Sequence, residues 1–256
     1  MSIVKKIIEH SRAFPTQRTP EWIEFRKTRI TGSEVATVIC QNKYQTRKSL
    51  LAKKRCTQPI HIDAPALEHG RKYEPIAIKK YEEQTGEKVH ELNMIGAPGN
   101  DRFAYSPDGL TESGRLIEVK CPFAREIKHE VPTYYMPQIQ MGLWILSMHG
   151  LDTVCDFIQY KPATEGRGEI LDILEVARDP SWFESNKAYI MTFLDDLDSP
   201  VTEAEQRAMD ESAKFQSFSR LNFSVEKSTE CLIVDDDPPM RLRKIQHNTS
   251  ECLIDD

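Results

Sequence analysis

Two kinds of hydrophobic pattern alternate along residues 1–200, and each predicts its own type of element. Apolar spacing and capping residues predict helices over residues 20–26, 31–39, 46–55, 66–84 and 180–194. Runs rich in β-branched and aromatic residues predict strands over residues 88–96, 102–106, 115–121, 153–160 and 169–176. The stretch 134–148 is apolar on nearly every side, which is typical of a buried helix.

Local signals mark several helix ends. Thr19 precedes Pro20, and a proline is well suited to the first helical position. Thr31 and Glu34 form a capping box, which begins the second helix. Pro75 lies inside the long helix and removes a backbone donor, so we expect a kink or a restart there.

Helices, strands, a helix and further strands follow one another in one continuous apolar pattern, which is typical of a mixed α/β (α+β) domain. We predict that this domain covers residues 1–200. Residues 203–218 fit one more helix, and acidic, Ser/Thr and Pro residues dominate the segment after it. Residues 201–256 are therefore expected to form a helical extension and an acidic, flexible tail.

The composition limits the class of protein. Of the 256 residues, 39% are hydrophobic and 29% are charged, as in a soluble globular protein. No apolar run reaches membrane-spanning length, the start lacks a secretory signal, and the six cysteines form no C-x-x-C pair. These features argue against a disulfide framework, a zinc finger and a cysteine-bound iron–sulfur cluster. We expect an intracellular protein of the cytoplasm or nucleus that is neither secreted nor bound to a membrane.

The net charge of −6 is unevenly distributed. From residue 195 onward the chain has 15 acidic and seven basic residues, so the first 194 residues carry +2. Six lysines and arginines and no acid lie within residues 43–55. This basic segment suits a DNA phosphate backbone, although a solvated helix face explains the same pattern.

The most informative stretch for chemistry lies between residues 106 and 122. Glu118 and Lys120 are two apart on a predicted strand, so their side chains share one face. The turn-forming residues 111–114 precede that strand, and we therefore expect Asp108 on the neighbouring strand of a hairpin, close to Glu118. Two carboxylates form a hard oxygen site for a divalent ion, and a lysine beside them can orient a water or steady developing charge. This combination predicts metal-assisted phosphodiester hydrolysis.

Each part of that pattern also has an ordinary explanation. An exposed Glu-x-Lys is commonly a solvated ion pair, and Asp-Gly is commonly a turn. The apolar neighbours Ile117, Val119 and Cys121 instead indicate a central strand. A charged side chain on such a strand needs a partner or a metal ion.

Glu74 is a further candidate for the same site. It shares a helical stripe with Ile78 and Tyr81, which turns its carboxylate towards the core. A carboxylate in that position needs either the metal ion or a salt bridge to Arg71 or Lys79.

Amides and arginines supply two more groups of candidates. Gln138 and Gln140 lie in the apolar helix, where each can bond a sheet edge or orient a water near the catalytic lysine. Ser33 lies in the first turn of a capped helix with Arg26 and Arg29 just before it, so these residues could bind a phosphate. An ordinary capped helix with surface arginines is the alternative.

Five ordered motifs resemble the lambda-exonuclease/YqaJ-type viral recombinase family within the PD-(D/E)xK nuclease superfamily. They lie between Trp22 and Lys161 and are W-x-x-x-R followed by I-T-G-S-E-V, H-G-x-x-Y-E, S-P-D-G-L, E-V-K-C-P and Y-M-P-Q-I-Q-x-x-L-W. The resemblance implies a restriction-endonuclease-like core, in which helices flank a central mixed sheet. No counterpart is apparent for the residues after about 200.

The resemblance implies an exonuclease that depends on Mg²⁺ or Mn²⁺, with two ions at each active site. Such an enzyme digests double-stranded DNA ends from 5′ to 3′ and leaves 3′ single strands for recombination by a strand-annealing protein. Relatives can form ring-shaped trimers. The resemblance also assigns metal binding to Glu74, Asp108, Glu118 and the Val119 carbonyl, and it assigns the positioning or activation of the attacking water to Lys120, supported by Gln138. It assigns binding of the terminal 5′-phosphate, or of nearby phosphates of the scissile strand, to Arg26, Ser33 and Ser106.

Two other functions fit the same residues. One is a structure-specific or site-specific DNA endonuclease on the same fold, and the other is a catalytically silent DNA-binding or recruitment module. The tail offers a partner site of its own, because residues 228–236 and 249–256 repeat a short apolar strand followed by acids. That pattern resembles motifs that bind SUMO-like modifiers by adding a strand to a sheet edge, and a chance match in an acidic tail is the alternative.

Overall fold

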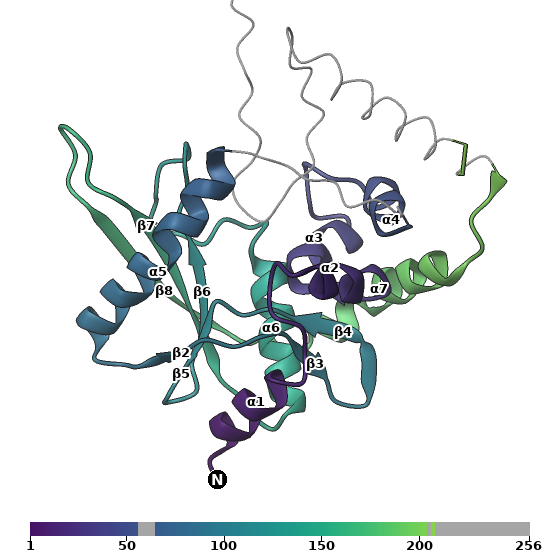
Figure 1. The fold of residues 1–256 in the computed structure, drawn as a ribbon, viewed down its shortest axis with the longest axis horizontal. Coiled ribbons are helices and arrows are strands. Elements are labelled where there is room, and N and C mark those ends of the chain that lie inside the picture. The colour runs from purple at the N-terminus through teal and green to yellow at the C-terminus, as the bar shows by residue number, and fades with distance from the viewer. Residues whose placement is uncertain (56–64, 204–205, 208–256) are drawn as a thin grey trace, which may run out of the picture.

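The computed structural model describes residues 1–55, 65–203 and 206–207 (Figure 1). The helices are α1 (Ile3–Ser11), α2 (Pro20–Lys27), α3 (Gly32–Val38), α4 (Arg47–Arg55), α5 (Pro65–Thr85), α6 (Met136–Met148) and α7 (Trp182–Asp198). The strands are β1 (Ile30–Thr31), β2 (Val89–His90), β3 (Ile95–Ala97), β4 (Asn100–Tyr105), β5 (Gly109–Thr111), β6 (Leu116–Lys120), β7 (Val154–Lys161) and β8 (Ile170–Ala177). The predicted mixed α/β class is confirmed. The tail repeat and most of the helix expected over 203–218 lie outside the described residues.

The strands form two sheets. The larger has five strands in the order β2-β5-β6-β7-β8, and the smaller has three in the order β1-β4-β3. Strands β6 and β7 are parallel, with α6 in the connection between them, whereas β5 and β8 run antiparallel to their neighbours. Every residue of β6 is buried, because this strand has a partner on each side.

Helices cover both faces of the larger sheet. On one face, Tyr81 of α5 packs in a cluster with Ile117 and Val119 of β6. On the other face, α6 contributes Ile139 and Leu143 to the main apolar core. Figure 1 shows α5 lying across the larger sheet and α6 at the centre of the molecule, with α2, α3 and α7 on the far side of α6 from α5.

The single strand predicted over residues 88–96 is wrong, and of the kink or restart expected at Pro75 the restart is excluded. Residues 88–96 form two strands in different sheets, since β2 pairs with β5 and β3 pairs with β4. Helix α5 runs unbroken through Pro75, so it does not restart there. Leu67 before the proline and Ala77 after it are both buried, so tertiary packing on each side of the proline stabilises the helix although one backbone donor is missing.

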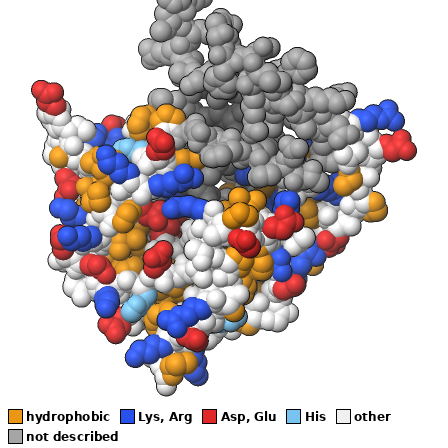
Figure 2. Space-filling model, in the orientation of Figure 1, with side chains coloured by type: hydrophobic (Ala, Val, Ile, Leu, Met, Phe, Trp, Pro, Cys, Tyr) orange, Lys and Arg blue, Asp and Glu red, His pale blue; other side chains and the backbone are white. Residues whose placement is uncertain are grey.

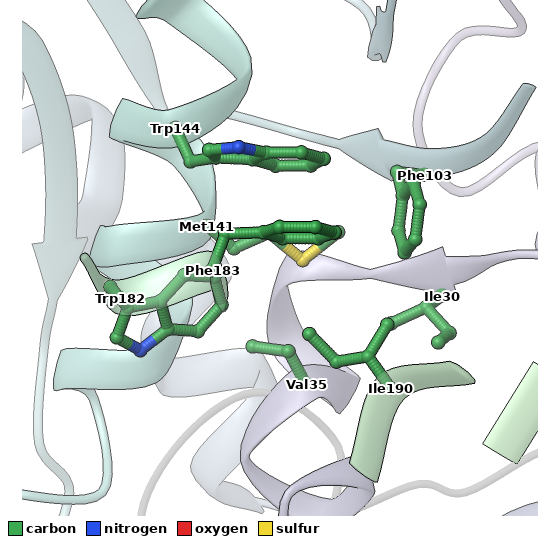
Figure 3. Close-up of a pocket in the computed structure, with 8 residues that line it drawn as sticks. All are labelled: Ile30, Val35, Phe103, Met141, Trp144, Trp182, Phe183 and Ile190. Carbon is green, nitrogen blue, oxygen red and sulfur yellow. The ribbon is translucent and has the colours of Figure 1, made fainter. Parts of the chain in front are cut away.

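An apolar pocket lies between α3, α6, α7 and β4 (Figure 3). The rings of Trp144 and Phe183 stack in it with centroids 4.0 Å apart. Its lining has no acid, base or nucleophile, so it is a feature of the core. Within the described part of the chain, no helix is both long enough and apolar enough to cross a bilayer.

Candidate active site

The β5–β6 hairpin brings Asp108 against the central strand. Gly109 pairs with Ile117 across the hairpin, so the residue just before β5 lies opposite the middle of β6. The Asp108 carboxylate accepts a hydrogen bond of 2.6 Å from the backbone N–H of Val119. Asp108 therefore lies next to the Glu118–Val119 peptide, as the turn pattern predicts.

Glu118 and Lys120 share the face of β6 that looks towards α6. The Lys120 Nζ lies 2.9 Å from the Glu118 Oε1, and both side chains are buried. Gln138 of α6 donates to the same oxygen at 2.6 Å. Val119 points the other way, into the cluster beneath α5, so the two faces of the strand separate polar from apolar side chains.

Two tyrosines complete this polar cluster. The hydroxyl of Tyr105 on β4 donates to the Glu118 Oε2. The ammonium of Lys120 lies 5.2 Å from the ring centroid of Tyr135, at the start of α6. Each charged group of the cluster thus has a defined orientation.

The surroundings of Asp108 disfavour the charged form of its carboxyl group. Burial, together with the negative charges of Glu118 and Glu74, raises the pKa of the Asp108 carboxyl well above its usual value. Lys120 and the Val119 N–H act in the opposite direction but do not offset it. A cation bound beside these carboxylates would offset their repulsion and stabilise their charged forms.

Glu74 lies at the edge of the cluster. Its half-buried carboxylate accepts a hydrogen bond of 3.3 Å from Arg18, so its salt-bridge partner is neither Arg71 nor Lys79. Among the described residues, no three His, Cys, Asp or Glu side chains stand close enough to hold a metal ion as they are. The structure therefore brings Asp108, Glu118, Lys120 and Gln138 together and leaves Glu74 paired with Arg18.

Gln140, the second amide of α6, has a different environment. Its Nε2 donates to the Ala177 carbonyl at 2.9 Å, and its Oε1 accepts from the Asp179 N–H at 2.7 Å. Gln140 thus forms hydrogen bonds at the end of β8. A bond to a sheet edge is one of the two roles that the sequence analysis gave for this residue.

The predicted phosphate-binding residues lie together beside this cluster. Arg26 donates to the Ser33 Oγ at 2.9 Å, and its guanidinium lies over the Trp22 ring at 4.2 Å. The Trp22 indole in turn donates to the Ser106 Oγ at 3.3 Å. Arg26 and Ser33 are therefore in direct contact, Trp22 links them to Ser106, and Ser106 is only two residues before Asp108.

Arg29, which the sequence analysis grouped with Arg26 and Ser33, has other partners. Its guanidinium stacks on Phe25, 3.6 Å from the ring centroid, and lies 3.6 Å from Asp101. Helix α3 has only seven residues, and the Glu34 side chain already accepts the Thr31 N–H at 3.3 Å. The charge of Arg26, rather than the helix end, would therefore attract an anion.

The basic segment 43–55 is used largely to hold the fold. Arg47 donates to the Tyr189 carbonyl at 2.8 Å, Arg55 donates to the Ser199 carbonyl at 2.9 Å, and Lys54 is buried. Figure 2 shows basic and acidic side chains interspersed on the face that it displays. The segment therefore offers DNA fewer cations than its sequence indicates.

Comparisons with known proteins agree with the fold. Residues 21–150 match the model of the YqaJ-like viral recombinase domain. The crystal structure of an alkaline exonuclease from Laribacter hongkongensis is 27% identical, with a TM-score of 0.57 over 77% of this chain and 100% of that one. A second structure of that exonuclease, in complex with dAMP, gives the same values.

Two viral proteins are also similar. Protein D345L of African swine fever virus is 30% identical over 158 residues, which are 50% of this chain and 46% of that protein. The uncharacterized protein R354 of Acanthamoeba polyphaga mimivirus is 27% identical over 179 residues, which are 63% of this chain and 31% of that protein. The matched region thus spans less than half the length of either viral relative.

Proposed function

Because the chain belongs to the family of YqaJ-like viral recombinase domains, we propose that it is a metal-dependent DNA exonuclease. It acts on the ends of linear double-stranded DNA and removes nucleotides of one strand from 5′ to 3′. The 3′ single strand that remains is the substrate of a strand-annealing protein. The family and the similarity to an alkaline exonuclease support nuclease activity, and an end-labelling assay tests the direction.

The geometry of two carboxylates on the hairpin carries the metal dependence: Asp108 bonds the Val119 N–H, directly beside Glu118. The negative charges of Glu118 and Glu74 raise the pKa of Asp108, and a divalent cation would offset that repulsion. Carboxylate and carbonyl oxygens suit Mg²⁺ and Mn²⁺, and the Val119 carbonyl adds a further oxygen. Glu74 would complete the set after exchanging Arg18 for the metal. Bound divalent ions would stabilise the charge that develops on the attacking and leaving oxygens.

Lys120 is the residue that we assign to the attacking water. Its ammonium is held by Glu118 at 2.9 Å, and Gln138 binds the same carboxylate oxygen, which limits how far the pair can rotate. A cation fixed in this way can orient a water molecule and stabilise the negative charge of the transition state without reorganising.

Arg26, Ser33 and Ser106 would hold the terminal 5′-phosphate. A guanidinium and two hydroxyls can donate several hydrogen bonds to phosphate oxygens. Ser106 and Asp108 lie on the same short connection before β5. A phosphate held by Ser106 would therefore be close to the Asp108 carboxylate. That proximity would favour cleavage near an end over cleavage within a duplex.

Duplexes labelled at one 5′ end or at one 3′ end, incubated with protein and Mg²⁺, test the proposal. We expect the 5′ label to be released first as mononucleotides and the 3′-labelled strand to remain full length at early times. Closed circular DNA should survive, and the same DNA should be digested after linearisation. The Glu118→Gln variant is the inactive control and Gln140→Ala the matched active one. Cutting of closed circles would favour the endonuclease alternative.

A further inference from the structure

Tyr105 occupies a slot that two glycines make possible. Its side chain is 1% exposed and passes between α3 and α6. A Cβ added at Gly32 would lie 2.3 Å from the Cδ2 atom of Tyr105, and one added at Gly142 would lie 2.7 Å from its Cζ atom. Real side chains do not tolerate such distances, so the ring fits only because both helices lack a side chain there.

Gly142 is unexpected in its own helix. It lies in the middle of α6, where glycine costs about 1 kcal/mol of helix stability relative to alanine. Close approach of Tyr105 gives this glycine a packing role, because any larger residue would displace the ring. The same ring also meets Gly32 in α3, which is an independent helix.

The end of this slot is the Glu118 carboxylate. The Tyr105 hydroxyl donates to Oε2, whereas Gln138 and Lys120 both bind Oε1. Of these three contacts within the described part of the chain, the one from Tyr105 is on Oε2. The third donor comes from β4 in the smaller sheet, and it therefore ties the carboxylate to a separate part of the fold.

We infer that Tyr105 is a positioning residue that sets the orientation of Glu118 for a divalent cation. This inference rests on the proposed function. A carboxylate oxygen can accept the tyrosine hydrogen bond and still offer a lone pair to a metal. Hydrogen-bond partners of metal ligands orient those ligands, and their loss typically reduces metal affinity about 10–100-fold.

Mn²⁺ titration by calorimetry, on the full chain without DNA, tests this role. We expect Tyr105→Phe, which fills the same slot without the hydroxyl, to bind Mn²⁺ about tenfold more weakly than the wild type. We expect Gly142→Ala, which keeps the hydroxyl but pushes the ring, to change affinity in the same direction. Circular dichroism confirms that each variant is folded.

Tyr81→Phe is the matched control. Tyr81 is also 1% exposed, and its hydroxyl donates at 2.5 Å to the buried carboxylate of Asp156, on the α5 side of the sheet. This variant should lose stability as Tyr105→Phe does, yet bind Mn²⁺ like the wild type. Unchanged Mn²⁺ affinity in Tyr105→Phe, or an equal loss in Tyr81→Phe, would overturn the inference. Failure of the wild type to bind Mn²⁺, or of Glu118→Gln to weaken binding, would instead overturn the proposed function.

Discussion

Lys54 Nζ lies 2.7 Å from Glu34 Oε2, and both side chains are buried. The same ammonium donates to the backbone carbonyls of Arg26 at 2.9 Å and Arg29 at 2.7 Å. Lys54 therefore fastens α4 to the end of α2 and to α3, the two helices that carry Arg26 and Ser33. Arg26 lies 3.4 Å from the same carboxylate. Two cations share one carboxylate, so the cluster has a net positive charge that suits an anion such as a phosphate.

Lys54→Met should destabilise the fold markedly. The variant leaves Glu34 buried without its nearest cation, and breaking a buried pair in this way costs about 3–5 kcal/mol. Urea unfolding measures the loss. Lys53→Met, at the neighbouring and less buried position, should change the free energy of unfolding by less than about 0.5 kcal/mol. A loss below 1 kcal/mol for Lys54→Met would mean that the pair is not structurally important.

The Glu34 carboxylate should also contribute to acid unfolding. Burial alone would raise its pKa, but the charges of Lys54 and Arg26 outweigh burial and lower the pKa from 4.5 to about 2. A carboxylate with a lowered pKa stabilises the fold above its unfolded pKa, and this contribution is lost as the pH falls from about 4.5 towards 2. The difference in urea midpoint between wild type and Glu34→Gln should therefore shrink over that range, because protonated Glu34 resembles glutamine. A constant difference would contradict the assignment.

Local periodicity was sufficient to place the central charged residues. Alternation along β6 puts Glu118 and Lys120 on one face, and the turn before that strand brings Asp108 beside them. Both relationships depend on residues fewer than about 12 positions apart, for which strand and turn geometry decide the outcome. The contact between Arg26 and Ser33 also joins residues that are only seven positions apart.

Relationships between distant elements were not predictable in this way. The Tyr105 hydroxyl donates to Glu118 from a strand of a different sheet. Arg47 donates to the carbonyl of Tyr189, which lies 142 residues further along the chain. No periodic pattern encodes either contact, since each depends on how whole elements pack. Helix α1 was also missed, although Ser2 as N-cap and the buried Val4 and Ile7 form a recognisable signal.

Arg26→Ala and Ser33→Ala should reduce the preference for 5′-phosphorylated ends. Each variant removes a hydrogen-bond donor of the proposed phosphate site. The cleavage rate on 5′-phosphate duplexes should therefore fall about 10–100-fold, while the rate on 5′-hydroxyl duplexes should change little. Initial rates on the two substrates measure the ratio. Arg29→Ala is the matched control, because Arg29 lies just after the helix that carries Arg26 but stacks on Phe25. An unchanged ratio in both Arg26→Ala and Ser33→Ala would remove the 5′-phosphate from this site.

Lys120→Ala should abolish cleavage and leave DNA binding intact. The ammonium lies 2.9 Å from the Glu118 Oε1 and 5.2 Å from the ring centroid of Tyr135, whereas the predicted phosphate contacts lie at Arg26, Ser33 and Ser106. We expect the cleavage rate to fall at least about 10³-fold, as when a preorganised charge is removed from a transition state. Fluorescence anisotropy with a labelled duplex in Ca²⁺ measures binding, and single-turnover digestion in Mg²⁺ measures cleavage. Lys128→Ala, whose lysine is exposed and 3.9 Å from Glu130, should behave as wild type in both. If Lys120→Ala cleaves at a near-normal rate, the water-activating role belongs to another group.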